Sequence, residues 1–326
     1  MVNAALIGFG WWGKNLAKAI ENDQTKIRFS RIITKELNDA KEYCQAHQIQ
    51  LSDDYQSALT DPSIEAVVLA TPHSMHAEQI ILAAKAGKHV FCEKPLTLKH
   101  EDAKSAIQAC EEYRVILAVG QNKRFWPSMA KLREVVASGT LGLLMHIEGH
   151  YSNEHSTKFF SDWREKPTES PAGGLTGTGI HIIDAMVNLA GQASQVSAHV
   201  SSFRAGKDPR DATSVNVQFQ NGISAYFAMV RATPIFWRMH AFGDTGSVEA
   251  IGETECIVRH NGGKIERFTC EPIDSIKAEL EAFATAINSN GKIPYPISTL
   301  EMSQTISLFE AIVESVNKQS IVRISI

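Results

Sequence analysis

The sequence predicts an α/β protein in which a doubly wound parallel sheet is followed by an α+β domain with a largely antiparallel open sheet. Three observations support this prediction. Short apolar runs alternate with helical patterns as far as Gly120, strand patterns dominate after it, and 326 residues are enough for two domains. We therefore expect one domain over residues 1–122 and a second over residues 123–326.

The N-terminal part reads as strands and helices in strict alternation. The run Ala66–Ala70 is apolar throughout, as expected of a central parallel strand that is covered on both faces. Alternation of this kind implies right-handed crossovers and a doubly wound sheet. The expected strands are Ala4–Ile7, Ile27–Ile33, Ala66–Ala70, His89–Cys92 and Ile116–Val119, and the expected helices are Lys14–Asn22, Leu37–His47, His76–Ala86 and His100–Tyr113.

The C-terminal part has a different rhythm. Asn221-Gly222 and Asn261-Gly262 fall between alternating segments and predict two hairpins. The expected helices are Ser128–Ser138, Ile180–Leu189, Ile276–Asn288 and Leu300–Asn317, with strands near Leu144–Tyr151 and at Ile321–Ile324. These patterns favour an antiparallel sheet with a few helices.

Composition and charge argue against several classes of protein. Hydrophobic residues make up 44% and charged residues 21%, with a net charge of −4 and no basic stripe, so we expect no nucleic-acid partner. No window is apolar enough for a membrane span, and the start lacks the features of a secretory signal. Five cysteines form no paired framework, and the histidines have no metal-binding spacing. We expect a soluble cytoplasmic protein without a metal.

A glycine-rich turn follows the first strand. Gly8-Phe9-Gly10-Trp11-Trp12-Gly13 has the spacing G-x-G-x-x-G, and it opens a helix at the start of a βαβ unit. The first glycine permits the tight turn, the second lets the backbone approach a pyrophosphate, and the third lets helix pack on strand. The helix N-terminus adds N–H groups and a positive dipole end. The sequence therefore predicts a dinucleotide-binding Rossmann domain.

The end of the second strand bears on the choice of cofactor. An acidic residue there normally accepts a hydrogen bond from the adenosine ribose 2′-hydroxyl, but this chain has Thr34 and Lys35, with Glu36 one step later. Lys35 could pair with a 2′-phosphate, which favours NADP over NAD. In the alternative, Lys35 is a surface lysine and Glu36 binds the ribose.

Further motifs resemble the family of glucose–fructose oxidoreductase, inositol dehydrogenase and the rhizopine-catabolism proteins (Gfo/Idh/MocA), and they cover essentially the whole chain. Glu93-Lys94-Pro95 after a Rossmann strand, with Gly179-x-His181-x-x-Asp184 downstream, is more specific than the glycines alone. The other matching segments are Thr71-Pro72-His73 with His76, Gly120–Phe125, Asp162-Trp163-Arg164, Gly173-Gly174, Glu279–Phe283 and Glu310–Ser315.

The resemblance implies the site residues. Besides the residues of the glycine turn, those implied to bind the cofactor are Thr34, Lys35, Thr71, Pro72, His76, Glu93, Lys94, Gln121, Trp163 and Arg164. Those implied to bind substrate are Lys94, Asn122, Arg124, Tyr151, Gly177, His181 and Asp184. The partners implied are a small-molecule substrate and further copies of the chain, in a dimer or tetramer formed through the C-terminal sheet.

The resemblance implies that Lys94 and His181 form the catalytic pair, which the sequence alone would not bring together. Oxidation of a secondary alcohol needs a group that accepts the hydroxyl proton, and histidine titrates near neutral pH. Lys94 follows a parallel strand at its carboxyl end, where such sheets bind ligands, and can donate to the reacting oxygen. The alternatives are a surface lysine and a core histidine. Asp184, one turn along, would orient His181 or face solvent.

Gly177 departs from the family pattern. The resemblance implies an aspartate here, four residues before the histidine, that helps to bind a sugar hydroxyl. We expect an NAD(P)-dependent dehydrogenase or reductase acting on a sugar-like or cyclic polyol or its ketone. The missing carboxylate and the aromatics Tyr151, Phe159, Phe160 and Trp163 also allow a dihydrodiol-type dehydrogenase that acts on a carbocycle. A third reading is a catalytically silent cofactor-binding regulator.

Overall fold

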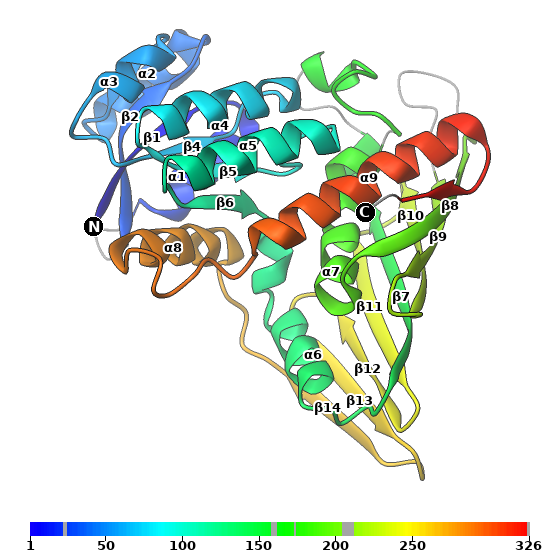
Figure 1. Ribbon diagram of the computed structural model, residues 1–326. Helices are drawn as coiled ribbons and strands as arrows, with labels where there is room; N and C mark the ends of the chain where they lie inside the picture. Colours follow the sequence, from blue (N-terminus) through cyan, green and yellow to red (C-terminus); the bar gives the residue numbers. More distant parts are fainter. Residues whose placement is uncertain (22–24, 158–161, 173, 204–211, 325–326) are drawn as a thin grey trace. The chain divides into compact units, whose positions relative to one another are not determined.

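The computed structural model describes residues 1–326 apart from 22–24, 158–161, 173, 204–211 and 325–326, and it divides into two compact units (Figure 1). The first unit comprises Met1–Asn122 and Asp274–Met302, and the second comprises Lys123–Ile273 and Ser303–Ile326. The sequence placed everything after residue 122 in one domain. The structure instead groups Asp274–Met302 with the N-terminal sheet.

The first unit is built on a parallel sheet of six strands in the order β3-β2-β1-β4-β5-β6. Its strands are β1 (Val2–Ile7), β2 (Ile27–Ile33), β3 (Gln50–Ser52), β4 (Ala66–Leu69), β5 (His89–Glu93) and β6 (Leu117–Gly120). This arrangement confirms the doubly wound fold. The edge strand β3 was not expected, because its three residues are too few to show a period.

Helices cover both faces of this sheet. The right-handed crossovers place α1 on one face and α4 and α5 on the other, where α4 and α5 lie side by side (Figure 1). The helices of this part are α1 (Trp11–Ala19), α2 (Leu37–Ala46), α3 (Tyr55–Thr60), α4 (His76–Lys85) and α5 (His100–Glu112). The helix α1 begins three residues before the expected Lys14, and the expected end at Asn22 lies outside the described residues.

The segment that returns to the first unit is centred on α8 (Ser275–Asn288). This helix packs beside α1 and against β1, β2 and β5. Phe283 of α8 lies with its ring 5.8 Å from that of Phe91 in β5. Further on, the Tyr295 hydroxyl donates to the carbonyl of Val119 in β6, at 2.8 Å. The apolar face of α8 is therefore buried on the Rossmann sheet, which explains the division into units.

The second unit contains a sheet of nine strands in the order β14-β13-β12-β11-β7-β10-β9-β8-β15. All its pairs are antiparallel except β7 with β10, which confirms the largely antiparallel sheet, and both expected hairpins are present. Its strands are β7 (Leu144–Asn153), β8 (Ala193–Ser201), β9 (Ala212–Phe219), β10 (Ser224–Arg231), β11 (Phe236–Gly243), β12 (Gly246–Ile251), β13 (Glu255–His260), β14 (Ile265–Thr269) and β15 (Val322–Arg323).

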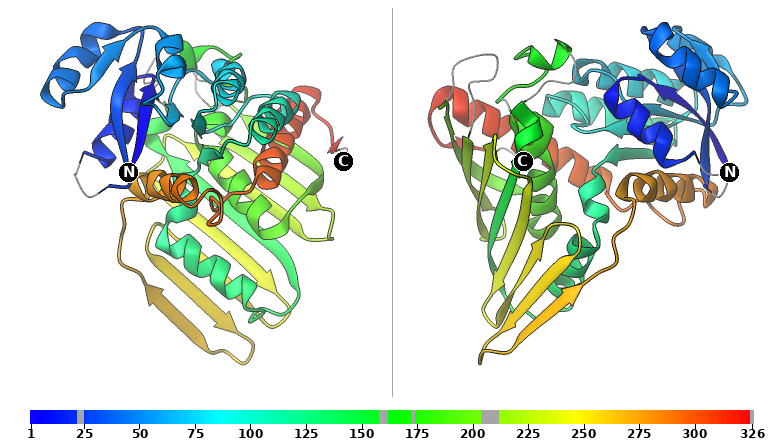
Figure 2. Two further views of the ribbon diagram at one scale, coloured as in Figure 1. Left: turned by 60° about the vertical axis from the view of Figure 1, so that its left-hand side comes forward. Right: turned by 180° about the vertical axis from the view of Figure 1, so that it is seen from behind.

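One face of this sheet carries helices. α6 (Pro127–Ala137) packs on β12 and β13, while α7 (Ile180–Ala190) packs on β7 (Figures 1 and 2). A Cβ at Gly149 of β7 would lie 2.6 Å from the Ile182 side chain of α7, so the glycine lets the helix approach closely. The long helix α9 (Thr299–Lys318) begins in the first unit and ends in the second. None of the helices in the described residues is long and apolar enough to cross a bilayer.

Candidate active site

The glycine turn between β1 and α1 leaves no room for side chains at two positions. Gly8 has a φ of +92°, and a Cβ there would lie 2.5 Å from the carbonyl oxygen of Ala70. A Cβ at Gly13 would collide with the carbonyl oxygen of Gly8. These close approaches hold the start of α1 against the ends of β1 and β4, as the sequence motif predicts.

The N-terminus of α1 fits a pyrophosphate. Gly10 is the N-cap; it makes no side-chain cap bond, and the first turn contains no acidic residue. A Cβ at Gly10 would meet nothing within 4 Å, so a ligand could approach the backbone there. The neighbouring Phe9 is buried and packs 5.1 Å from the ring of Tyr43, while Trp11 is 48% exposed. The uncapped N–H groups and the open glycine leave this helix start accessible to an anion such as the pyrophosphate that the sequence motif predicts here.

At the end of β2, the side chains of Thr34, Lys35 and Glu36 are held locally. The Thr34 hydroxyl donates to the Glu36 carboxylate at 2.9 Å. The Lys35 ammonium donates to the backbone carbonyl of Asp53, also at 2.9 Å. The exposed Glu36 carboxylate thus lies at the strand end where Rossmann domains bind the adenosine ribose, while the exposed Lys35 contacts the loop that contains Asp53.

His76 links the loops that follow β4 and β5. Its ring is fully buried, with Nδ1 2.9 Å from the carbonyl oxygen of Pro95 and Nε2 3.1 Å from that of Thr71. The Thr71 hydroxyl in turn donates to the Gln79 side chain of α4. Because both ring nitrogens face backbone carbonyls, the histidine connects the loop after β4 to the loop that begins with Lys94. That His76 lines the cofactor stays a prediction.

Glu93 ends β5 and Lys94 follows it. Glu93 is 5% exposed and accepts from the Lys94 backbone N–H at 3.2 Å, whereas Lys94 is only half-buried. The Glu93 carboxyl group lies against Gly120 at the end of β6, where a Cβ would come within 2.6 Å of Oε1. Gln121 is buried beside it, and Asn122 donates to Ser275 of α8 at 3.2 Å.

In the second unit, Arg124 and Asp184 form a buried ion pair. Arg124 Nε lies 2.6 Å from Asp184 Oδ2, and Nη2 lies 3.0 Å from Oδ1, with side-chain exposures of 4% and 3%. This bidentate geometry joins the segment after β6 to α7. Asp184 does not face solvent. The structure shows the two residues bound to each other, and their expected contact with substrate stays a prediction.

His181 is the second residue of α7 and is 6% exposed. It follows a π-helical turn, Leu175–Gly179. Gly177 within that turn is exposed, and a Cβ there would meet nothing within 4 Å. The position therefore has room for the carboxylate that the family pattern places there. Lys94 lies in the first unit and His181 in the second, so their pairing stays a prediction.

An aromatic cluster surrounds the amine of Lys123. The Nζ atom lies 3.7 Å from the ring centre of Trp126, 4.6 Å from that of Tyr151 and 5.5 Å from that of Trp237. Burial raises the pKa of Tyr151 to about 12, so its phenol stays neutral at physiological pH. Sequence reasoning included Tyr151 but missed Trp126 and Trp237. Trp237 lies beside Tyr151 because β7 pairs with β11, and Trp126, at the N-cap of α6, packs on Trp237.

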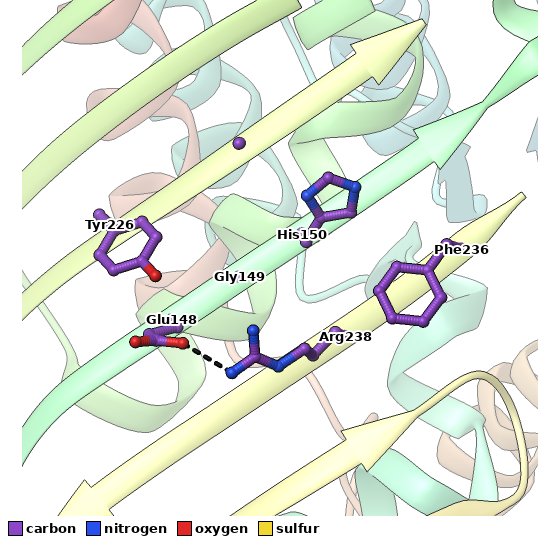
Figure 3. A pocket seen from close by; sticks show the side chains of 7 residues that line it. Glu148, Gly149, His150, Tyr226, Phe236 and Arg238 are labelled. Atoms are coloured by element: carbon purple, nitrogen blue, oxygen red, sulfur yellow. Dashed lines mark hydrogen bonds and ion pairs between the residues drawn. The ribbon is translucent and has the colours of Figure 1, made fainter. Parts of the chain in front are cut away.

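The opposite face of this sheet bears a pocket lined by polar and aromatic side chains (Figure 3). The Glu148 carboxylate accepts from Arg238 at 2.7 Å, and His150, Tyr226 and Phe236 lie around them. Burial, with Arg238 nearby, lowers the pKa of His150. Because strand side chains alternate, His146 and His150 point away from the face that carries Tyr151.

The remaining expected residues lie in or near the undescribed segments. Arg164 stacks on the ring of Trp163 at 4.8 Å, within a short helical turn. Phe159, Phe160 and Gly173 lie outside the described residues. Among those described, no group of three or more His, Cys, Asp or Glu side chains could hold a metal ion.

The fold and the glycine site define a class: proteins with a nicotinamide-dinucleotide Rossmann unit followed by an α+β unit. Residues 2–121 match the model described as "Oxidoreductase family, NAD-binding Rossmann fold", and residues 129–249 match the GFO/IDH/MocA C-terminal domain. The chain belongs to the Gfo/Idh/MocA oxidoreductase family.

Named relatives show the range of the family. Levoglucosan dehydrogenase of Pseudarthrobacter phenanthrenivorans is 33% identical over 47% of this chain, and the match spans 40% of that enzyme. Trans-1,2-dihydrobenzene-1,2-diol dehydrogenase of Mus musculus is 28% identical over 66% of this chain and 67% of that protein. A levoglucosan dehydrogenase structure in complex with NADH and levoglucosan has a TM-score of 0.88, with 25% identity and 99% coverage of both chains.

Proposed function

We propose that this protein is an NAD(P)-dependent dehydrogenase that transfers hydride between nicotinamide and a secondary alcohol or ketone of a sugar-like or cyclic polyol. The observation that carries the proposal is the glycine turn. There the N-terminus of α1 has no side-chain cap and no acidic residue in its first turn, and the space beside Gly10 is open. The family and the sugar-derived substrate of levoglucosan dehydrogenase support the class of reaction.

The chemistry requires two groups near the reacting oxygen. Bound nicotinamide supplies the hydride acceptor. We assign Lys94 to donate a hydrogen bond to the alcohol oxygen and His181 to take the hydroxyl proton as the carbonyl forms. His76 supports Lys94, because its ring bridges the Pro95 and Thr71 carbonyls. The Arg124–Asp184 pair supports His181, since it anchors the next turn of α7.

The cofactor preference follows from the end of β2. The sequence favoured NADP through Lys35, but this lysine donates to the Asp53 carbonyl, while Thr34 holds the Glu36 carboxylate in place. A fixed carboxylate accepts from a ribose hydroxyl and repels a 2′-phosphate. We therefore propose NAD as the preferred cofactor. Glu36→Gln should reduce the difference in binding affinity between NAD and NADP. A selective loss of NADP affinity in Lys35→Ala would show instead that the lysine binds the 2′-phosphate.

A second candidate is a dihydrodiol-type dehydrogenase that acts on a carbocycle. One observation favours it: Gly177 offers no carboxylate to bind a sugar-like diol. The mouse dihydrodiol dehydrogenase is a relative with such a substrate.

A substrate panel separates these candidates. Levoglucosan, inositols and trans-dihydrobenzenediol should each be offered with NAD and with NADP, and the reduced cofactor followed by absorbance. Turnover of the sugar-like compounds supports the first candidate, and turnover of the diol alone supports the second. Gly177→Asp should be tolerated or improve activity on a sugar-like diol, but should weaken binding of the flatter carbocycle, because a desolvated charge would face it. Tight cofactor binding without any turnover would favour a silent regulator.

We also propose that the pocket-bearing face of the nine-stranded sheet pairs with a second copy of the chain. Tyr226 and Phe236 both line the pocket on this face and are 42% and 44% exposed, so two aromatic rings face solvent from one part of the sheet. Beside them lie both signs of charge, with Arg238 bound to Glu148 and Glu249. Such a face can meet its own copy across a two-fold axis.

A further inference from the structure

Glu279 is a buried carboxyl group that the proposed reaction does not use. It lies in the second turn of α8 and is 0% exposed. Neither of its side-chain oxygens has a hydrogen-bond partner among the described residues. Burying an ionised carboxylate without a partner costs several kcal/mol, and such a group usually keeps its proton instead.

The packing of α8 on β5 brings Glu279 towards Glu93. Phe283, one turn further along the helix, packs on Phe91 of β5. Side chains two residues apart in a strand share a face, so Glu93 lies on the same face as Phe91. Side chains four residues apart in a helix also share a face, which places Glu279 beside Phe283. Glu279 and Glu93 therefore lie on the facing sides of α8 and β5, near enough that Glu93 and the neighbouring Lys94 both influence the Glu279 carboxyl group electrostatically.

The charges around Glu279 act in a consistent direction. Burial raises its pKa most, the negative charge of Glu93 raises it further, and Asp274 adds to this, while only Lys94 lowers it. The result is a pKa well above the ordinary value. The elements that pack against α8 in this unit carry other charged or titratable side chains that do not contribute to this shift in the pKa of Glu279. These are Lys14, Lys18, Arg28, Arg31 and His89.

We propose that Glu279 is a neutral carboxylic acid at physiological pH, so that of these two carboxyl groups only Glu93 carries a negative charge towards Lys94. Glu279 then acts as a positioning residue. If Glu279 and Glu93 were both ionised, they would draw the Lys94 ammonium group towards the protein interior and raise its pKa. A single charge keeps the lysine cationic but lets it donate to a substrate oxygen. The consequence for catalysis rests on the proposed function, whereas the protonation of Glu279 does not.

Infrared spectroscopy tests the protonation directly. The wild-type protein at pH 8 should show the carbonyl band of a protonated carboxylic acid. Glu279→Gln should remove this band, and Glu281→Gln, two residues along the same helix, should leave it. Glu93→Gln should retain the band but move its titration to lower pH, because a repelling charge is lost. Absence of the band in the wild type, or its survival in Glu279→Gln, would overturn the proposal.

The effect on Lys94 can be measured without a substrate. The rate at which this lysine reacts with an amine-specific reagent at pH 8, located by peptide mass spectrometry, reports its deprotonated fraction. Glu279→Gln replaces one neutral group by another and should leave the rate unchanged, whereas Glu93→Gln should raise it severalfold. Equal acceleration in both variants would mean that Glu279 is ionised and would contradict the proposal. Because neither readout uses turnover, a failed substrate panel would count only against the proposed function.

Discussion

Lys94 is the residue on which the proposed chemistry depends most. It emerges half-buried from the end of β5, its backbone N–H is bound to the Glu93 carboxylate, and the next residue is tied to His76. His181 is nearly buried at the start of α7. When the backbone of a residue is held in this way, its side chain can place its polar group at a defined position. Hydrogen bonding and proton transfer to a substrate require such positioning.

Alanine variants test these two residues. Lys94→Ala and His181→Ala should each lower kcat by about a hundredfold or more, because each removes a group from the same proton transfer. The losses should be less than additive in the double variant. Cofactor binding should change little in His181→Ala. Wild-type rates in both single variants, with a substrate identified by the panel, would refute the assignment.

The sequence predicted the positions of single residues better than it predicted contacts between residues that are distant along the chain. The glycine turn could be interpreted from its spacing and context, since a strand, a tight turn and a helix start leave local signals. The pairing of Arg124 with Asp184 could not, because 60 residues separate them and both were expected to face a substrate. The position of Glu279 near Glu93 depends on how α8 packs on β5, which no local pattern reveals.

At the scale of elements, short or returning segments were the ones missed. The strand β3 and the helix α3 have three and six residues, too few for a hydrophobic period to show. The helix α8 itself was expected at nearly its observed bounds. Its membership of the first unit was not, since an amphipathic helix does not specify which sheet it covers.

The Arg124–Asp184 pair gives a prediction about α7. Asp184→Ala should destabilise the protein by about 3–5 kcal/mol, because it leaves the Arg124 charge buried without its carboxylate. Chemical denaturation measures this change. Glu314→Ala serves as control, since its pair with Lys318 is exposed at 43% and 63% and should contribute no more than about 1 kcal/mol. A loss for Asp184→Ala as small as that of the control would contradict the role of the pair.

Glu279 also gives the whole molecule a pH dependence. A carboxyl group whose pKa is raised on folding binds more protons in the folded state than in the unfolded state. Stability therefore falls as the pH rises from the ordinary glutamate pKa towards the folded one. Glu279→Gln should remove this decline, so its free energy of unfolding should fall less between acid and neutral pH than that of the wild type. Parallel curves for the two proteins would refute the raised pKa.

A substitution at the exposed Tyr226 tests the proposed pairing of the sheet with a second copy of the chain. Tyr226→Glu should weaken self-association, because it places a charge on the face that we propose to pair with a second copy. Tyr113→Glu, at the residue that follows α5, is a matched control, with 41% exposure against 42%. Sedimentation velocity should show a smaller species for Tyr226→Glu alone. If both variants keep the mass of the wild type, the pocket-bearing face is not the interface.

Cofactor binding tests the central claim most directly. Calorimetric titration of the purified protein with NAD(H) and NADP(H) should show binding of at least one pair, with NAD(H) the tighter. Gly10→Asp should abolish it, because a carboxylate would face the pyrophosphate at the open N-terminus of α1. The folded state of the variant can be checked by circular dichroism. Wild-type protein that binds neither cofactor, or a folded Gly10→Asp variant that binds as the wild type does, would contradict the account.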